Sequence, residues 1–324
     1  MLYVTATLQE GWPGGEPVIA RNTIYHLRKL GYNVVEAFYK PRYPKLEGYV
    51  APLRLYLDPS DVFWPSYLYY KRIIQEKKPN IIIAQYDFDD SIVKAAVDEN
   101  VKILVYVHIW WPLCPKLTRL TPEGEICSGF AYGDCKRCLI ESASSSLKAG
   151  IARILLTNKL IRKKMENRIK LLNSDNVTIL ALSHHMKALL ASYGIREDKI
   201  EVLPNGQTFS YMDLSGIPKE KIVGYYGGQA EHKGYKIFYR LAEIVKAKVP
   251  DARFVATGAF SIRSPNIDYV GLLDRIEVAK LMARSMVTVM PSIWDEPFGM
   301  VAIESLAVGT PVVAFDVGVL REII

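Results

Sequence analysis

The sequence predicts an α/β protein with two parallel-sheet domains, and two patterns indicate this fold. Short apolar runs typical of buried strands alternate with amphipathic helical stretches almost throughout the 324 residues. The alternation restarts in a more compact form after residue 219. Because a chain of this length can bury two separate cores, we expect two Rossmann-type domains.

The first half is predicted to carry one sheet and its covering helices. The expected strands are Leu2–Thr7, Asn33–Phe38, Ile81–Ala84, Ile103–His108, Val177–Leu182 and Ile200–Leu203. Helical spacing of apolar residues falls in Val18–Leu30, Tyr67–Glu76, Ser91–Glu99, Leu139–Leu172 with a break near Gly150, and His184–Tyr193.

The second half repeats the scheme. The expected strands are Ile222–Tyr226, Arg253–Thr257, Asp268–Val270, Val287–Met290 and Pro311–Phe315. The expected helices are Tyr235–Val249, Arg275–Arg284 and Val301–Val308. We therefore expect a first domain over residues 1–206, a polar hinge over 207–218 that contains Gly and Pro, and a second domain over 219–324.

Composition favours a folded protein with an anionic partner. Half of the residues are hydrophobic and 23% are charged, which is ordinary for a globular chain. The formal net charge of +7 suits a nucleotide diphosphate, a lipid headgroup or a nucleic acid. Residues 1–10 do not resemble a secretory leader, and the most apolar stretch, Ile103–Leu113, is too short to span a bilayer. We expect a cytoplasmic protein.

In parallel sheets, ligands bind beyond the carboxyl ends of the strands, so the loops after the strands are the candidate sites. The turn with Gly14 and Gly15 precedes a helix and would let backbone amides approach a phosphate, although such glycines often mark only a flexible turn. The loop over residues 227–234 also precedes a helix, and its Lys233 would add positive charge at the helix start. It is not a P-loop, because no Ser or Thr follows the last glycine.

A third loop carries two carboxylates. Glu296 is expected at the junction between loop and helix, with Glu304 two turns along the same helix face and Pro297 in the first helical turn. Two glutamates at this spacing are common on solvated helices, but the Pro-Phe-Gly between them distinguishes this segment from such a helix. These carboxylates could accept hydrogen bonds from sugar and ribose hydroxyls.

These motifs together resemble glycosyltransferase family 4, which has the GT-B fold of two Rossmann-like domains facing across a cleft. The resemblance covers nearly the whole chain, and its most specific part is the E-x7-E segment in its Pro-Ser and Gly-x-Pro context. The motifs are Gly227…Lys233-Gly234, Leu203-Pro-Asn-Gly206, Pro291-Ser…Glu296-Pro-Phe-Gly…Glu304 and Ala307-x-Gly309-x-Pro311.

The resemblance implies roles for individual residues. Glu296 would hold the donor sugar, Lys233 the diphosphate and Glu304 the ribose. His108 corresponds to a histidine near the reacting carbon, so His108 and Glu296 are the expected catalytic residues, although a histidine at a strand end is often only structural. The implied donor-binding residues are Gly14, Gly15, Gly228, Lys233, Phe298, Gly299, Glu304 and Glu322.

The implied activity is sugar transfer with retention of anomeric configuration, without a catalytic metal. The donor would be a UDP-, GDP- or ADP-sugar, and the acceptor a glycan, a lipid or a small molecule. Positive charge around the leaving diphosphate would stabilise the charge that develops on it.

Three features depart from the family pattern. Many members have arginine where this chain has Gly228, so Lys233 acts alone or is joined by Lys236 or Arg263. Many also have aspartate where this chain has Ile109. After Gly318 and Glu322 the usual terminal helices are expected to be absent, which a shortened form, a fragment or a completing partner would explain. A catalytically inactive sugar-nucleotide-binding or scaffold protein is therefore the alternative.

All four cysteines fall in the loop over residues 114–138: Cys114, Cys127, Cys135 and Cys138. One C-x2-C pair within so short a segment is typical of a structural zinc site. Disulfides and free thiols remain the alternatives, behind zinc in a cytosolic chain.

Two other segments have competing interpretations. The basic segment 159–170 is either a solvated helix face over the core, which we favour, or a peripheral contact with an anionic membrane at its inner face. The run Asp87-Phe-Asp89-Asp90 is interpreted as a loop and helix N-cap rather than a metal motif. No nucleic-acid partner is expected, because the chain lacks an aromatic-interleaved basic groove and zinc-finger histidines. The context of Glu296 and Glu304 speaks against a nucleotide-sugar epimerase.

Overall fold

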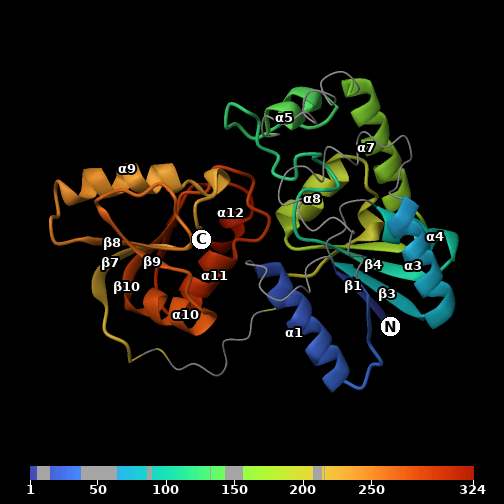
Figure 1. The fold of residues 1–324 in the computed structure, drawn as a ribbon, viewed down its shortest axis with the longest axis horizontal. Coiled ribbons are helices and arrows are strands. Elements are labelled where there is room, and N and C mark those ends of the chain that lie inside the picture. Colours follow the sequence, from blue (N-terminus) through green and yellow to red (C-terminus); the bar gives the residue numbers. More distant parts are fainter. Residues whose placement is uncertain are drawn as a thin grey trace. The chain divides into compact units, whose positions relative to one another are not determined.

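The computed structural model describes residues 1–5, 15–37, 64–85, 90–131, 133–142, 156–206, 214 and 216–324. The chain divides into two compact units, one formed by Met1–Glu123 and Cys127–Gly206, the other by Gln207–Ile324 together with Gly124–Ile126. Most of the predicted hinge, 207–218, lies outside the described residues. Figure 1 traces both units.

The first unit is built on a six-stranded sheet in the order β2-β1-β3-β4-β5-β6, and each neighbouring pair is parallel. Its strands are β1 Leu2–Thr5, β2 Val35–Ala37, β3 Ile81–Gln85, β4 Lys102–Val107, β5 Val177–Ala181 and β6 Ile200–Val202. The central strands are buried, with Ile82, Ile103 and Val177 fully excluded from solvent. Such continuous apolar runs are what a sheet covered on both faces requires.

Helices surround this sheet (Figure 1). They are α1 Gly15–Lys29, α3 Trp64–Lys77, α4 Ser91–Asp98, α5 Cys135–Ser142, α7 Asn158–Leu172 and α8 His184–Ser192, with the short 3₁₀ turn η1 Glu197–Lys199. Of these, α5 lies away from the sheet against α7 (Figure 1). The side chains of Thr157 and Ser183 cap α7 and α8 by accepting a backbone N–H of the first turn. Helix α5 begins four residues before the predicted Leu139, so it includes the C-x2-C pair.

The second unit is a five-stranded parallel sheet in the order β11-β10-β7-β8-β9. Its strands are β7 Glu220–Tyr225, β8 Arg253–Thr257, β9 Ile267–Gly271, β10 Ser285–Met290 and β11 Val312–Ala314. Its helices are α9 Tyr235–Lys246, α10 Arg275–Arg284, α11 Met300–Ala307 and α12 Leu320–Ile323, with the 3₁₀ turn η2 Glu231–Lys233. The chain proceeds from β7 through β8 to β9 at one edge of the sheet, and then returns to β10 on the other side of β7. The strands β7 and β10 therefore flank a topological switch point.

Asp87 and Asp89 lie outside the described residues, whereas Asp90 occupies the predicted N-cap position of α4. The Asp90 side chain makes no capping hydrogen bond. Instead, its Oδ2 lies 2.7 Å from Nε of Arg168, and both side chains are more than nine-tenths buried. Arg168 therefore does not belong to the solvated face predicted for segment 159–170, although Lys159, Arg162 and Lys163 on the same helix are exposed.

The apolar face of α7 packs into the first unit through Ile161, Met165, Ile169 and Leu172. Among the described residues, no helix combines the length and the apolar composition that crossing a bilayer requires.

Candidate functional site

The loops that follow β7 and β10 meet at the switch point of the second unit. Gly234 caps α9 in a left-handed conformation with φ of 76°. A Cβ on this residue would lie 1.8 Å from the carbonyl oxygen of Pro291, which begins the loop after β10. Only glycine fits this contact, so it fixes the turn that carries Lys233 against the loop that carries Glu296.

Lys233 and Glu296 form an ion pair at this point. The ammonium nitrogen lies 2.9 Å from each carboxylate oxygen. The Glu296 side chain is 6% exposed and that of Lys233 is 27% exposed, so the carboxylate is buried and the ammonium reaches solvent. The structure thus joins two residues that the sequence predicted for the sugar and the diphosphate of one donor.

Two further groups donate hydrogen bonds to the Glu296 carboxylate. Ser292 Oγ lies 3.1 Å and Trp294 Nε1 lies 2.8 Å from its Oε2. Burial alone would raise the pKa of Glu296, but Lys233 and the bonds from Trp294 and Ser292 hold that pKa below its ordinary value. The residue therefore carries a negative charge in the folded protein.

The backbone of Glu296 is held from the segment before α12. Gly318 has φ of 57°, and a Cβ there would lie 2.3 Å from the backbone nitrogen of Glu296. Val319 donates its N–H to the Glu296 carbonyl at 3.0 Å. Glu322 lies on α12, which follows this segment. Its predicted role as a donor-binding residue stays a prediction.

The prediction that Glu296 and Glu304 share one helix face is wrong. Helix α11 begins at Met300 after Gly299, whose φ of 72° is left-handed. Pro297 and Glu296 therefore lie in the loop before the helix, not in its first turn. Phe298 is buried, and Gly299 packs so closely on α12 that a Cβ would lie 2.9 Å from Leu320.

Glu304 lies on α11, where it meets a residue that sequence reasoning missed. Nη2 of Arg275, the first residue of α10, lies 3.5 Å from Glu304 Oε1. Burial raises the pKa of Glu304 above its ordinary value, and Arg275 only partly opposes this shift. Because the two residues are 29 positions apart on different helices, spacing could not have paired them.

The structure gives a physical reason for glycine at position 228. Gly228 has φ of 63°, although a Cβ on it would meet nothing within 4 Å. An arginine here would adopt the left-handed conformation at a cost. Of the predicted substitutes, Lys236 pairs with Glu231, and the Arg263 guanidinium lies 5.4 Å from the ring centroid of Tyr269.

In the first unit, His108 follows β4 directly. Its ring stacks on that of Tyr106 with centroids 4.7 Å apart, and its buried Nε2 has no hydrogen-bond partner among the described residues. Burial lowers the pKa of His108 to about 3, so the imidazole is neutral. Gly15 is the first residue of α1, and Gly14 lies outside the described residues.

The loop after His108 is held by the buried pair of Asp90 and Arg168. Nη1 of Arg168 donates to the carbonyl of Trp111 at 2.6 Å, and the guanidinium lies 5.3 Å from the Trp111 ring centroid. Trp110 and Trp111 are almost fully buried. Sequence reasoning missed this network because its members are far apart in the chain.

The four cysteines lie in one loop and the first turn of α5, and none is in a disulfide. Arg119 donates its backbone N–H to Cys114 Sγ at 3.4 Å, and Gly129 donates to Cys127 Sγ at 3.3 Å. Burial, with the neighbouring thiols, raises the pKa of Cys135 to about 12. Among the described His, Cys, Asp and Glu side chains, no three are grouped so as to hold a metal ion. The zinc site stays a prediction.

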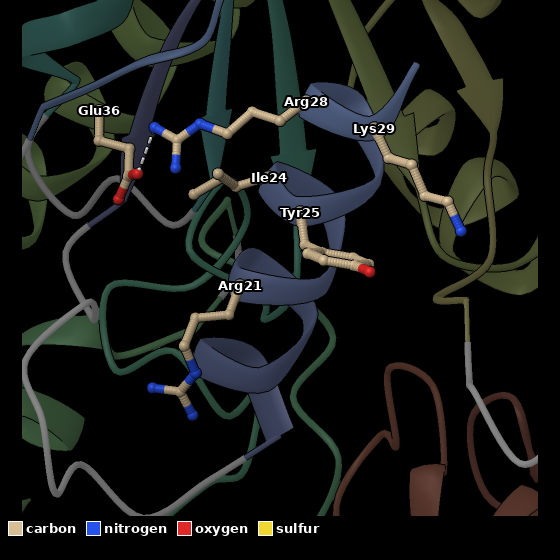
Figure 2. Close-up of a pocket in the computed structure, with 6 residues that line it drawn as sticks. All are labelled: Arg21, Ile24, Tyr25, Arg28, Lys29 and Glu36. Carbon is tan, nitrogen blue, oxygen red and sulfur yellow. Dashed lines mark ion pairs between the residues drawn. The ribbon is translucent and has the colours of Figure 1, made fainter. Parts of the chain in front are cut away.

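A separate hollow of about 400 Å³ lies beside α1 in the first unit. Figure 2 shows Arg28 extending from α1 toward Glu36, with which it forms a 2.7 Å ion pair, whereas Tyr25 and Lys29 point away from Glu36. The lining residues are Arg21, Ile24, Tyr25, Arg28, Lys29 and Glu36. None of them was predicted as a site residue.

Two consecutive parallel-sheet α/β units, the second with charged loops at its switch point, define a protein of the GT-B fold class. The crystal structure of HepE from Anabaena in complex with UDP matches 100% of this chain and 82% of its own, with a TM-score of 0.60 and 16% identity. A glycosyltransferase from Rickettsia africae matches 98% of this chain and 79% of its own, with a TM-score of 0.58 and 18% identity. The likeness shows the fold, and the predicted fold class is confirmed.

The family follows from two sequence models. The model described as Glycosyltransferase Family 4 matches residues 13–207, and the one described as Glycosyl transferases group 1 matches residues 211–324. The first match alone covers more than half of the 324 residues, so the chain belongs to glycosyltransferase family 4.

The curated relatives match this chain over part of its length. A D-inositol 3-phosphate glycosyltransferase from Paenarthrobacter aurescens is 30% identical in an alignment of length 162 that covers 42% of this chain and 40% of that protein. An uncharacterised glycosyltransferase from Methanocaldococcus jannaschii is 26% identical in an alignment of length 177 that covers 46% of this chain and 45% of that protein. The chain thus matches less than half the length of either relative.

Proposed function

We propose that the chain is a retaining glycosyltransferase that takes its sugar from a nucleotide-diphosphate donor held by the second unit. The observation that carries the proposal is the ion pair of Lys233 and Glu296 where the loops after β7 and β10 meet. Family membership supports sugar transfer as the reaction, and the pair lies where parallel sheets bind nucleotides.

The donor would lie along the charged groups of this edge. Lys233 sits at the turn before α9, where the amides of the helix start add positive potential. The diphosphate would bind there, and Lys233 would stabilise the charge that develops on it as the glycosidic bond breaks. Glu304, beside Arg275, would accept hydrogen bonds from the ribose hydroxyls.

The first unit would supply His108 and the acceptor site. A buried, neutral imidazole can offer a hydrogen bond to a sugar hydroxyl without carrying charge into the site. HepE was crystallised with UDP and with UDP-glucose, which makes UDP-sugars the first donors to test. The acceptor in this proposal is a glycan, a lipid or a small molecule.

The experiment is incubation of the full chain with UDP-glucose, GDP-mannose and ADP-glucose without acceptor. We expect slow release of one nucleoside diphosphate. Proton NMR should show that the released sugar first appears as the same anomer as in the donor. First appearance of the opposite anomer would exclude retention. Tight binding of a donor without any release would favour the inactive sugar-nucleotide-binding alternative.

A further inference from the structure

Trp294 contacts both charged residues of the ion pair. Its indole N–H donates to Glu296 Oε2 at 2.8 Å, and the Lys233 ammonium lies 4.5 Å from the centroid of its ring. The Trp294 side chain is only 5% exposed. The bond between the indole N–H and Glu296 is therefore made away from bulk water, where hydrogen bonds are stronger. The Trp294 ring also supports an ammonium that still reaches solvent.

Trp294 is itself held by the turn that carries Lys233. The rings of His232 and Trp294 have centroids 4.5 Å apart at an interplanar angle of 54°. In addition, Ile293 donates its N–H to the carbonyl of His232 at 3.0 Å. The loops after β7 and β10 are thus fastened through the indole as well as through the ion pair.

We propose that Trp294 is a positioning residue that fixes the Lys233 ammonium relative to Glu296, so that Lys233 meets the donor diphosphate in a prepared geometry. The inference rests on the proposed donor site. A lysine has a flexible four-carbon stem, and ordering it on binding costs affinity. An ammonium supported by the Trp294 ring, beside a carboxylate fixed by the indole N–H, has already lost much of that freedom.

This role predicts an effect on phosphate recognition alone. Trp294 acts through Lys233, which would contact the diphosphate, and not through Glu304, which would contact the ribose. Loss of the indole should weaken the binding of nucleoside diphosphates more than the binding of the matching monophosphates. If Trp294 were only structural, its loss would weaken the binding of both ligands equally, because the whole site would be damaged.

The test is calorimetric titration of the full chain with UDP and UMP, and likewise with GDP and GMP and with ADP and AMP. For Trp294→Leu we expect the ratio of diphosphate to monophosphate affinity to fall about tenfold, with little change in monophosphate affinity. Trp294→Phe keeps a ring beneath Lys233 and should recover part of the ratio. Ser292→Ala removes a different hydrogen bond to the same Glu296 oxygen and should leave the ratio within about threefold of wild type.

The outcomes separate the inference from the proposed function. If the wild type binds no nucleoside diphosphate, the donor site is wrong and the role of Trp294 falls with it. If the wild type binds one but Trp294→Leu keeps the ratio, or loses both affinities equally, the positioning role is wrong while the donor site stands. Should Trp294→Leu fail to fold, an unchanged ratio in Trp294→Phe overturns the inference equally.

Discussion

The ammonium of Lys233 lies 2.9 Å from both carboxylate oxygens of Glu296 across 63 residues of sequence. The Glu296 carboxylate also accepts hydrogen bonds from Ser292 and Trp294, so it has three polar partners in all. A diphosphate that approached Lys233 would share the ammonium with this carboxylate. The affinity of the site for a nucleotide therefore depends on how Lys233 divides its hydrogen bonds between the two.

Replacing Lys233 should weaken diphosphate binding and destabilise the protein. In Lys233→Met, the loss of a charge-assisted contact should lower affinity for the nucleoside diphosphate about 10- to 100-fold by calorimetry. Glu296 would also be left buried without its cation, at a cost of about 3–5 kcal/mol in the free energy of unfolding. Lys221→Met is the matched control, because Lys221 pairs with Asp251 at an exposed position of the same unit. Equal affinities in wild type and Lys233→Met would exclude Lys233 from the site.

Donor binding should weaken as the pH falls through the raised pKa of Glu304. Burial raises that pKa above the ordinary 4.5, so protonation removes the ribose-accepting carboxylate at a higher pH than for an exposed glutamate. The folded state binds this proton more readily than the unfolded state, so the contribution of Glu304 to stability falls as pH rises through the folded pKa.

The measurement is nucleotide affinity from about pH 8 to about pH 5 for wild type and Glu304→Gln. The variant should bind more weakly at neutral pH and lack the Glu304 step. Glu243→Gln, on an exposed face of α9, is the control and should titrate like wild type. An acid step that persists unchanged in Glu304→Gln would belong to another group.

Gly234 should not tolerate a side chain. An alanine Cβ would meet the Pro291 carbonyl at 1.8 Å while the backbone holds φ of 76°. The left-handed conformation alone costs about 1–2 kcal/mol, and relief of the clash would part the two loops. We expect Gly234→Ala to lower the thermal midpoint by several degrees and to reduce nucleotide affinity. Gly216→Ala is the control, since nothing lies within 4 Å of its added Cβ. A midpoint equal to that of the control would contradict the packing described here.

The buried pair of Asp90 and Arg168 should stabilise the first unit. Arg168→Met leaves a buried carboxylate without its cation and releases the Trp111 carbonyl, and we expect a loss of about 3–5 kcal/mol in denaturant unfolding. Arg162→Met, at an exposed position of the same helix, should change stability by less than about 0.5 kcal/mol. In a double-mutant cycle, Asp90→Asn should cost far less in the Arg168→Met background than in the wild type. Additive effects would mean that the pair does not interact.

Much of the fold was predictable because its signals are local. The apolar run of β4 and the capping residues of α7 and α8 lie within single segments, and the predicted strands of both sheets are present within a few residues. The C-x2-C helix began earlier than predicted, since the start of a short helix depends on tertiary contacts as well as on periodicity.

The site was predictable only where a motif carried it. Lys233 and Glu296 were singled out by their loops, and the fold brought them together. The placement of Pro297 in the first helical turn was wrong, because the left-handed Gly299 sets the start of α11 at Met300. The pair of Arg275 with Glu304 and the bond from Arg168 to Asp90 carry no local signal, because distant elements create these contacts. Trp294 contacts Glu296 within one loop, but its contact with Lys233 comes from a distant turn.

The most direct test of the donor site is calorimetric titration of the full chain with UDP-, GDP- and ADP-sugars. The account predicts one-to-one binding of donors with a single base, strongly reduced in Lys233→Met and in Glu304→Gln. A folded chain that binds none of the three donors, or that binds one equally well in both variants, would contradict it.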